Sequence, residues 1–310
     1  MTGSLINILL AESGMPRADL VKIIATAPSR YKVFTIPKRS GGLREIAQPA
    51  RELKLLQRIL IDAVLVKLPV HDTAQAYRAG RSILNNALPH SGRLPILKMD
   101  FTEFFPRIRS EDWLAYGREH AVLSEEDLRI SANLLFRRRK GESVLRLSIG
   151  APSSPQLSNA LMMKFDEVVS QEAEKRSISY SRYADDLTFS NQRIGFLKDM
   201  IEIVRRGARE VPYPHLEVNN RKTIFVTPAS RRAVTGLVLA NDGTVGLGRE
   251  RKRRLSASVH RFLQGDMSLL DLRKLAGDLA FAKSVEPESI DWLKSKYGVE
   301  AIDRIKRLRN

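Results

Sequence analysis

Apolar residues recur at helical spacing in some stretches of the chain and alternate with polar residues in others. Residues 1–28 show helical spacing that is interrupted near Gly14, so two short N-terminal helices are expected there. Residues 31–36 alternate as a strand, residues 38–42 contain turn-forming glycines, and residues 43–47 alternate again. This pattern predicts a β-hairpin with a basic rim.

The next part of the chain predicts a long helix, a connection and a buried strand. From Pro49 to near Pro69 the leucines fall on one helical stripe, whereas residues 75–90 are polar with little periodicity and predict an irregular connection. Residues 95–101 form an apolar run that carries an acid near its end, which is typical of a buried strand. Residues 110–136 predict a helical region with one internal restart.

The middle of the chain combines a turn-rich loop with a second hairpin. Residues 147–156 are rich in Ser, Pro and Gly, and residues 157–169 after them have helical periodicity. Residues 177–190 contain two runs rich in β-branched and aromatic residues, which flank the sequence Tyr-Ala-Asp-Asp at 183–186. This tetrapeptide is therefore expected at the tip of a hairpin. A helix over residues 196–206 follows.

The end of the chain predicts one more hairpin and a helical bundle. Residues 224–226 predict a short strand, and residues 233–239 and 244–247 predict a hairpin around an Asn-Asp-Gly turn. Apolar stripes in residues 249–310 predict three helices, the last of which begins at Pro287. Strands joined as hairpins and interspersed with helices indicate an α+β fold.

Three carboxylates stand out by their context. Asp185 and Asp186 are adjacent on the expected turn, where their charges repel each other and a divalent cation would stabilise them. An isolated Asp-Asp pair is more often a solvated turn than a metal site. Asp100, however, ends a core strand, where a charge is costly to bury unless it is paired or bound to a cation. The three together predict a site for two Mg²⁺ ions, which suits the in-line phosphoryl displacement of nucleotidyl transfer.

The charge balance points to a polyanionic partner. The 310 residues include 52 Lys and Arg but only 35 Asp and Glu, which gives a net charge of +17. Nucleic acid is favoured over a membrane because no sustained basic amphipathic helix is evident, and the alternative is a basic protein without such a partner. The last 62 residues carry 15 basic and nine acidic side chains. A basic helical bundle of this kind suits contact with a duplex backbone.

The residues that are missing exclude several classes of protein. The chain has no cysteine, which excludes disulfides, thiolate zinc sites and cysteine nucleophiles. No run approaches about 18 apolar residues, and the N-terminus lacks a basic segment followed by an apolar core. We therefore expect a soluble cytoplasmic protein with no membrane partner and no signal peptide.

The order of these motifs resembles that of reverse transcriptases, whose palm carries one aspartate on a first strand and an Asp-Asp pair on a Tyr-X-Asp-Asp hairpin. More narrowly, the chain is similar to bacterial retron reverse transcriptases. The sequence Asn-Ala-Leu-Pro-His at 86–90 matches that lineage's Asn-Ala-X-X-His element, and Val-Thr-Gly at 234–236 matches its Val-Thr-Gly element. The resemblance extends from about Tyr31 to the C-terminus.

The resemblance implies a right-hand polymerase with fingers, a palm built on an antiparallel sheet with helices, and a C-terminal helical thumb. The implied boundaries are an N-terminal helical segment over 1–30, fingers over 31–95, a palm over 96–248 with a fingers insertion near 120–150, and a thumb over 249–310. No attached nuclease domain is expected, because the thumb takes up the remaining length.

The resemblance also implies roles for the acidic site. Asp100 and Asp185 match the principal metal ligands, and Asp186 completes the acidic site. The backbone carbonyl of Phe101 is expected to contact a metal ion. Lys222 matches the lysine proposed to protonate pyrophosphate as it leaves, a role that an ammonium group can fill.

Further roles concern the nucleotide and the nucleic acid. Lys38 and Arg44, which by themselves read as parts of a solvated basic hairpin, match the fingers residues that hold the triphosphate. Phe105 matches the aromatic steric gate that excludes a ribose 2′-hydroxyl, and Gly150 belongs to the loop that borders the nucleotide. Taken alone, His90 has no neighbouring metal ligand and reads as a structural hydrogen-bonding residue. The expected RNA- or DNA-binding residues are Asn86, His90, Arg249, Arg251, Lys252, Arg253 and Arg254.

One departure from the family pattern concerns this loop. Many reverse transcriptases have Leu-Pro-Gln-Gly before the helix, whereas this chain has Leu-Ser-Ile-Gly at 147–150. Ile149 cannot make the hydrogen bonds of a glutamine side chain, so nucleotide contacts and fidelity are expected to differ there.

Membership among retron enzymes would imply partners that the residues themselves do not show. These are deoxynucleoside triphosphates, a cognate structured noncoding RNA that serves as template and primer, a branched RNA–DNA product primed from an RNA 2′-hydroxyl, and an effector protein in defence against phage. The alternatives are a reverse transcriptase of another bacterial lineage, either group II intron-like or diversity-generating, and a noncatalytic RNA-binding protein on a polymerase scaffold.

Overall fold

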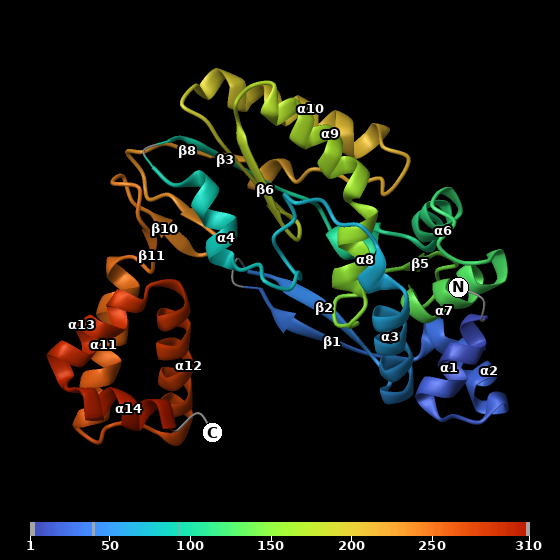
Figure 1. Cartoon of the computed structure of the whole chain (residues 1–310), viewed down its shortest axis with the longest axis horizontal. Helices are drawn as coiled ribbons and strands as arrows, with labels where there is room; N and C mark the ends of the chain where they lie inside the picture. Colours follow the sequence, from blue (N-terminus) through green and yellow to red (C-terminus); the bar gives the residue numbers. More distant parts are fainter. Residues whose placement is uncertain (1–3, 39–40, 93, 308–310) are drawn as a thin grey trace. The chain divides into compact units, whose positions relative to one another are not determined.

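The computed structural model describes residues 4–38, 41–92 and 94–307 (Figure 1). The chain separates into two compact units: unit 1 contains residues 1–81 and 97–225, and unit 2 contains the remainder. Two residues of the expected turn at 38–42, the first three residues of the chain and the last three residues of the expected thumb lie outside the described residues. Within the described part of the chain, no helix is both long and apolar enough to cross a membrane.

Unit 1 holds most of the helices. Its α-helices are α1 Leu5–Ser13, α2 Arg17–Thr26, α3 Arg51–Ala63, α5 Phe104–Arg107, α6 Ser110–Glu119, α7 Glu125–Leu135, α8 Ser154–Leu161, α9 Met163–Glu174 and α10 Ile194–Glu210. Its 3₁₀-helices are η1 Ala27–Ser29, η2 Leu65–Lys67 and η4 Asn220–Lys222. Local sequence explains several starts: Ser124, for example, accepts a hydrogen bond from the N–H of Asp127 and so caps α7.

A four-stranded sheet forms the centre of unit 1. Its spatial order is β6 Ser179–Tyr183, β7 Asp186–Ser190, β3 Ile96–Asp100 and β8 Ile224–Val226. Two smaller hairpins are β1 Tyr31–Pro37 with β2 Leu43–Pro49, and β4 Arg137–Arg138 with β5 Leu145–Arg146. Helices α9 and α10 lie side by side against the central sheet (Figure 1). Their apolar faces supply Phe165, Val169, Leu197 and Val204 to a core shared with Phe189 of β7.

Unit 2 is built from two separated stretches of sequence and has its own core. Its elements are α4 Ile83–Ala87, η3 Leu88–His90, β9 Ala233–Val234, β10 Leu237–Leu239, β11 Val245–Gly246, α11 Arg249–Leu263, α12 Leu269–Val285, α13 Pro287–Tyr297 and α14 Val299–Arg307. The three short strands form a sheet in the order β11-β10-β9. The four C-terminal helices bury Leu255, Val259, Leu279, Ile290 and Ile302 in this core.

Most of the predicted elements are confirmed, including both N-terminal helices, the hairpin at 31–47, the strand that ends at Asp100 and the hairpin that carries Asp185. The irregular connection predicted for residues 75–90 is wrong, because that stretch contains α4. Ser82 caps this helix by accepting a hydrogen bond from the N–H of Asn85, and five helical residues are too few to show a periodic pattern.

Three further expectations need correction. The helix expected over 157–169 is two helices. The first, α8, begins three residues earlier at Ser154 with Pro155 in its first turn, and Met162 separates it from α9. The strand expected over 233–239 is two strands, because Thr235 and Gly236 adopt positive φ and turn the chain. The C-terminal bundle has a fourth helix, α14, which buries Ile302 and Ile305.

Candidate active site

The tip of the β6–β7 hairpin presents two adjacent carboxylates. Tyr183 pairs with Asp186 across the hairpin, so that only Ala184 and Asp185 lie between the paired strands. Ala184 is buried and has a φ of 58°, a left-handed conformation that is unusual for a residue with a side chain. The tight turn therefore fixes the direction in which Asp185 and Asp186 leave the sheet.

Asp100 ends β3, the strand next to β7 in the sheet. The residue is 5% exposed. The backbone on either side is held by two hydrogen bonds of 2.8 Å, from the N–H of Asn219 to the carbonyl of Asp100 and from the N–H of Thr102 to the carbonyl of Glu217. The position of the Asp100 carboxylate is thus set by backbone pairing and burial.

Two of the three carboxylates, those of Asp185 and Asp186, have raised pKa values. Burial, together with the charges of Asp100 and Asp186, raises the pKa of Asp185 to about 6. Desolvation and the charge of Asp100 also raise the pKa of Asp186. The Asp186 side chain is more exposed to water than that of Asp185, so solvent screens its interactions more strongly. The hairpin tip and the end of β3 thus concentrate negative charge.

Lys222, at the end of η4, partly balances this charge. Its Nζ donates a hydrogen bond of 2.7 Å to Oδ2 of Asp100. Burial alone would lower the pKa of Lys222, but the bond to Asp100 and the charges of all three aspartates raise it. The side chain of Lys222 is therefore protonated and lies where the three aspartates make the electrostatic potential negative.

The donor set suits a hard divalent cation, although it is not a preformed cage. Across residues 4–38, 41–92 and 94–307, no group of three or more Asp, Glu, His or Cys side chains converges closely enough to hold a metal ion. Oδ1 of Asp100 is buried and has no hydrogen-bond partner among these residues. A buried carboxylate oxygen without a partner beside two mutually repelling carboxylates fits Mg²⁺, which takes oxygen ligands.

A pocket of about 760 Å³ in unit 1 brings most of the predicted site residues together. Asp100, Asp185 and Lys222 line it with Lys38 and Arg44 of the β1–β2 hairpin region. Phe101, Phe105, Tyr77, Arg137, Arg139, Arg146 and Ile149 contribute to the same lining. Asp186 and Gly150 do not line this pocket. The pocket is thus a cleft lined both by the carboxylates of Asp100 and Asp185 and by cationic side chains.

The aromatic residues after β3 form a packed stack that leads to Phe105. Phe101 packs edge-on against Phe165 with the ring centroids 5.4 Å apart, and it stacks on Phe104 at 5.9 Å. Phe104 in turn contacts Phe105 edge-on at 5.3 Å. Phe101 and Phe104 are buried, whereas Phe105 is half-buried and reaches the pocket. Its ring position is fixed from below by the core.

Gly150 shapes the pocket through the backbone. Its φ is 120°, and a Cβ placed on it would lie 2.9 Å from the carbonyl oxygen of Ala47. The neighbouring carbonyl of Ile149 accepts a 2.8 Å hydrogen bond from the N–H of Ala47 in β2. Only glycine allows this close approach of the loop to the β1–β2 hairpin.

The residues predicted to bind RNA or DNA lie in unit 2 and differ in accessibility. Asn86 and His90 are buried, at 1% and 0% exposure, and burial lowers the pKa of His90 to about 3. Because both side chains are buried, an effect of Asn86 or His90 on RNA binding would have to arise through the backbone segment that these side chains support. The five basic residues at the start of α11, in contrast, are half-buried or exposed.

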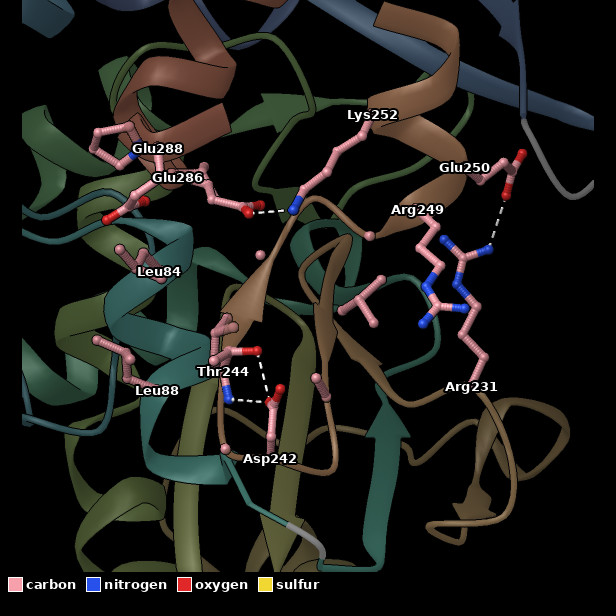
Figure 2. Close-up of a pocket in the computed structure, with 18 residues that line it drawn as sticks. Leu84, Leu88, Arg231, Asp242, Thr244, Arg249, Glu250, Lys252, Glu286 and Glu288 are labelled. Carbon is pink, nitrogen blue, oxygen red and sulfur yellow. Dashed lines mark hydrogen bonds and ion pairs between the residues drawn. The ribbon is translucent and has the colours of Figure 1, made fainter. Parts of the chain in front are cut away.

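Some of these α11 cations already have partners. Figure 2 shows Lys252 pointing to Glu286 across a pocket of about 1040 Å³. Glu250 of the same helix forms an ion pair with Arg254 at 3.6 Å and another with Arg231, which precedes the helix. The guanidinium of Arg251 lies 4.3 Å from the centre of the Phe281 ring. Arg249, Arg253 and Arg254 are exposed, so these three side chains are the most accessible cations of the predicted set.

The sequence alone did not identify several residues near the turn at 184–186, which carries Asp185 and Asp186 and which we call the acidic turn. Tyr77 lines the pocket with a φ of 60° and 47% exposure, yet it sits in a stretch without periodicity. Arg182, in the middle of β6, is fully buried against Asp166 of α9. The strand sequence Ser-Tyr-Ser-Arg-Tyr gives no local signal of this burial, because a charge is buried only when it is paired and the partner of Arg182 lies on another element.

Comparison with known proteins places this geometry in a family. The family model described as reverse transcriptase (RNA-dependent DNA polymerase) matches residues 36–264. Retron Ec83 reverse transcriptase of Escherichia coli is 38% identical over 293 residues, which cover 93% of this chain and 94% of that protein. Retron Ec86 reverse transcriptase of Escherichia coli is 34% identical over 92% of this chain and 88% of its own length.

Structural comparison supports the same fold. A telomerase from Candida albicans, solved in complex with a TWJ fragment of telomeric RNA, aligns with a TM-score of 0.50 at 12% identity. The alignment covers 89% of this chain and 60% of that one. The helices and antiparallel strand pairs form the expected α+β right-hand polymerase fold. The chain therefore belongs to the reverse transcriptase family, and within it to the retron reverse transcriptases, and it is an RNA-directed DNA polymerase.

Proposed function

We propose that this polymerase extends DNA by a two-metal mechanism at the pocket that joins the acidic turn to the basic hairpin. Asp100, Asp185 and Asp186, with the carbonyl of Phe101, would hold two Mg²⁺ ions. When bound, the ions lower the pKa of the attacking hydroxyl and stabilise the charge on the triphosphate. The observation that carries the proposal is one pocket lined by Asp100, Asp185 and three cations, Lys38, Arg44 and Lys222.

The other pocket residues would orient the nucleotide. Lys38 and Arg44 are exposed on the β1–β2 side of the pocket, where their charges suit a triphosphate. Phe105 would stack beneath the sugar and leave no room for a 2′-hydroxyl, so deoxynucleotides are preferred. Gly150 would act by keeping the backbone of its loop next to β2 rather than by touching the nucleotide.

Lys222 would supply a proton to the leaving group. A primer hydroxyl loses its proton to water, its oxygen bonds to the α-phosphorus, the bond from this phosphorus to the oxygen that bridges the α- and β-phosphates breaks, and pyrophosphate departs. The proton that pyrophosphate needs sits on Nζ of Lys222, at the lining of the same pocket. The raised pKa of Lys222 keeps it protonated until the negative charge on pyrophosphate develops.

We further propose that the template is a cognate structured noncoding RNA and that synthesis begins from an RNA 2′-hydroxyl, giving a branched RNA–DNA. The similarity to the two Escherichia coli retron enzymes over nearly the whole chain supports this. The basic helices from residue 249 onward would act as a thumb on the duplex, and Asn86 and His90 would shape an RNA-binding segment. The same proposal places the enzyme in the bacterial cytoplasm, in phage defence with an effector protein.

The experiment expresses the chain with its upstream flanking transcript and measures branched RNA–DNA in cells. Wild type should accumulate the branched product, and Asp185→Asn should abolish it while RNA binding stays nearly intact. Linear complementary DNA made only from an added primer would support a reverse transcriptase of another bacterial lineage and reject self-priming. Absence of DNA synthesis in both assays, with RNA still bound, would instead indicate a noncatalytic RNA-binding protein.

A further inference from the structure

A charged cluster lies buried directly behind the acidic turn. Arg182 of β6 and Asp166 of α9 are both fully buried. The Arg182 guanidinium reaches Asp166 through Nη2 at 2.5 Å and through Nε at 2.9 and 3.0 Å, and the hydroxyl of Tyr180 donates to the same carboxylate at 2.8 Å. Burial and the nearby Asp166 carboxylate raise the pKa of Tyr180, which keeps this hydroxyl a donor.

Stability alone is a weak explanation for such a cluster. Removing two charges from water is costly, and a buried ion pair is often no more stabilising than apolar side chains of similar volume. The presence of a buried ion pair is better explained when donors not used within the pair hold neighbouring groups in one geometry. The remaining donor of Arg182 is Nη1, which points away from Asp166 toward the turn.

Nη1 of Arg182 holds the turn at the residue before the catalytic pair. It donates 3.1 Å hydrogen bonds to the carbonyl of Ala184 and to Oδ1 of Asn159 in α8. Ala184 is the residue whose left-handed backbone directs Asp185 out of the hairpin. A donor on its carbonyl opposes rotation of this peptide, which offsets the strain of positive φ.

The same cluster also reaches the segment that carries Tyr77. The other end of the Asn159 amide donates to the carbonyl of Ala76 at 2.8 Å. The backbone of Arg182 brackets this segment as well, because its N–H donates to Thr73 and its carbonyl accepts from Gln75, both at 2.8 Å. Tyr77, which follows Ala76, has a φ of 60° and lines the pocket with Asp185.

We propose that Asp166, Arg182 and Asn159 form a positioning cluster that holds the Asp185 turn and the Tyr77 segment in a fixed relation. The geometry assigns Arg182 as its centre, since one planar guanidinium serves the helix, the turn and the amide at once. A lysine supplies the same charge as a compact group without this fork. The inference rests on the proposed catalytic role of Asp185.

The test compares Arg182→Lys with Ser131→Ala in the full chain. Arg182→Lys keeps a positive charge beside Asp166 but loses the fork to Ala184 and Asn159. Ser131→Ala is the matched control, because it removes a buried 2.9 Å hydrogen bond from Trp113 elsewhere in unit 1. The measurements are Tm, Kd for a primed RNA template, kcat and KM for single deoxynucleotide addition, and hydrogen exchange of residues 183–190.

Arg182→Lys should lower kcat by roughly 10- to 100-fold, with Kd for the template within about twofold of wild type. Exchange at residues 183–190 should rise in the absence of metal, whereas Ser131→Ala should lower Tm without either effect. Wild-type kcat and exchange in folded Arg182→Lys would overturn the proposal. So would a loss of activity that only follows Tm, as in the control.

If Arg182→Lys does not fold, Asn159→Ala decides the question. It leaves the Asp166 pair intact and removes the link from Arg182 to Ala76, so kcat should still fall and exchange should rise in residues 73–77. An unchanged kcat would overturn the proposal. Asp185→Asn is measured in parallel: activity in that variant would reject the proposed catalytic role, whereas an inactive Asp185→Asn with fully active cluster variants would reject the positioning role alone.

Discussion

Nζ of Lys222 lies 2.7 Å from Oδ2 of Asp100, so a proposed proton donor and a proposed metal ligand share a hydrogen bond. The lysine side chain is 54% exposed and the aspartate side chain 6%. The pair therefore joins the buried end of β3 to the open pocket, and substitutions at Lys222 can separate charge balance from proton donation.

Lys222→Arg should retain charge balance and lose proton donation. A guanidinium keeps the pairing with Asp100, but its pKa is too high for general acid catalysis. We expect kcat for deoxynucleotide addition to fall by about 10²- to 10⁴-fold with KM changed little. Lys222→Gln should lose both functions and also raise KM. Equal kcat in Lys222→Arg and wild type would exclude Lys222 as the acid.

Asp185→Asn should stabilise the metal-free protein while it removes synthesis. The pKa of Asp185 is raised to about 6 in the folded chain, so folding favours its protonated form. The resulting stability is complete below the unfolded pKa of about 4 and is lost as the pH rises through about 6. At pH 7.5 the charged group therefore costs about 1–3 kcal/mol, which the neutral amide avoids.

The measurement is urea unfolding at pH 7.5 with EDTA and again with Mg²⁺. Mg²⁺ should stabilise wild type but not Asp185→Asn. Asp199→Asn is the control, since Asp199 is an exposed residue of α10 and the substitution changes the net charge equally. An Asp185→Asn chain less stable than wild type in EDTA would contradict the crowding of the three carboxylates.

Phe105→Ala should admit ribonucleotides. The ring is held from below by Phe104, and its removal opens space at the lining of the pocket without disturbing Phe101. Selection for deoxynucleotides over ribonucleotides, measured as the ratio of kcat/KM values, should fall by about 10²-fold or more. Phe105→Tyr, which keeps the ring, should retain selection. Unchanged selection in Phe105→Ala would remove this residue from the gate.

Gly150→Ala should weaken both the fold and nucleotide binding. The added Cβ would lie 2.9 Å from the carbonyl of Ala47, and φ is 120°. Gly141→Ala is the matched control, because φ there is 82° with no atom within 4 Å of the added Cβ. We expect about 1 kcal/mol of lost stability in the control and at least about 2 kcal/mol at Gly150. KM for the nucleotide should rise only in Gly150→Ala; equal effects of the two variants would refute a close-packing role.

His90 should make stability depend on pH between neutrality and mild acid. Burial lowers the pKa of His90 to about 3, below its ordinary value of about 6.5. The folded chain thus binds fewer protons than the unfolded chain below pH 6.5, and stability falls as the pH drops toward 3. The loss at pH 5 should be about 2 kcal/mol.

Urea unfolding at pH 7 and pH 5 checks this. His90→Gln should flatten the pH dependence, although it lowers stability at pH 7. His260→Gln, at an exposed position of the same unit, should not alter the slope. If His90→Gln keeps the slope of wild type, the acid sensitivity belongs to other groups.

The sequence was sufficient for the parts of this fold that depend on neighbours along the chain. Alternation placed the β6–β7 hairpin, and the acid at the end of an apolar strand identified Asp100. The buried cluster was not predictable in the same way, because Asn159 meets Ala76 across 83 positions and Arg182 meets Asp166 across 16. A single arginine on a strand reads as solvent-exposed until the helix that carries its partner is placed.

Unit 2 combines two stretches of sequence that are far apart along the chain. This affects how the growing chain folds and what a C-terminal truncation would do. Ile83 and Leu94 offer carbonyls that accept hydrogen bonds from Thr235 and Arg232, at 3.1 and 2.7 Å. A growing chain would finish residues 82–96 long before these partners leave the ribosome, so the segment must wait in an open state. A chain cut before residue 226 would keep that segment without its partners. The part of the chain from residue 226 onward is thus required to fold a stretch that precedes Asp100.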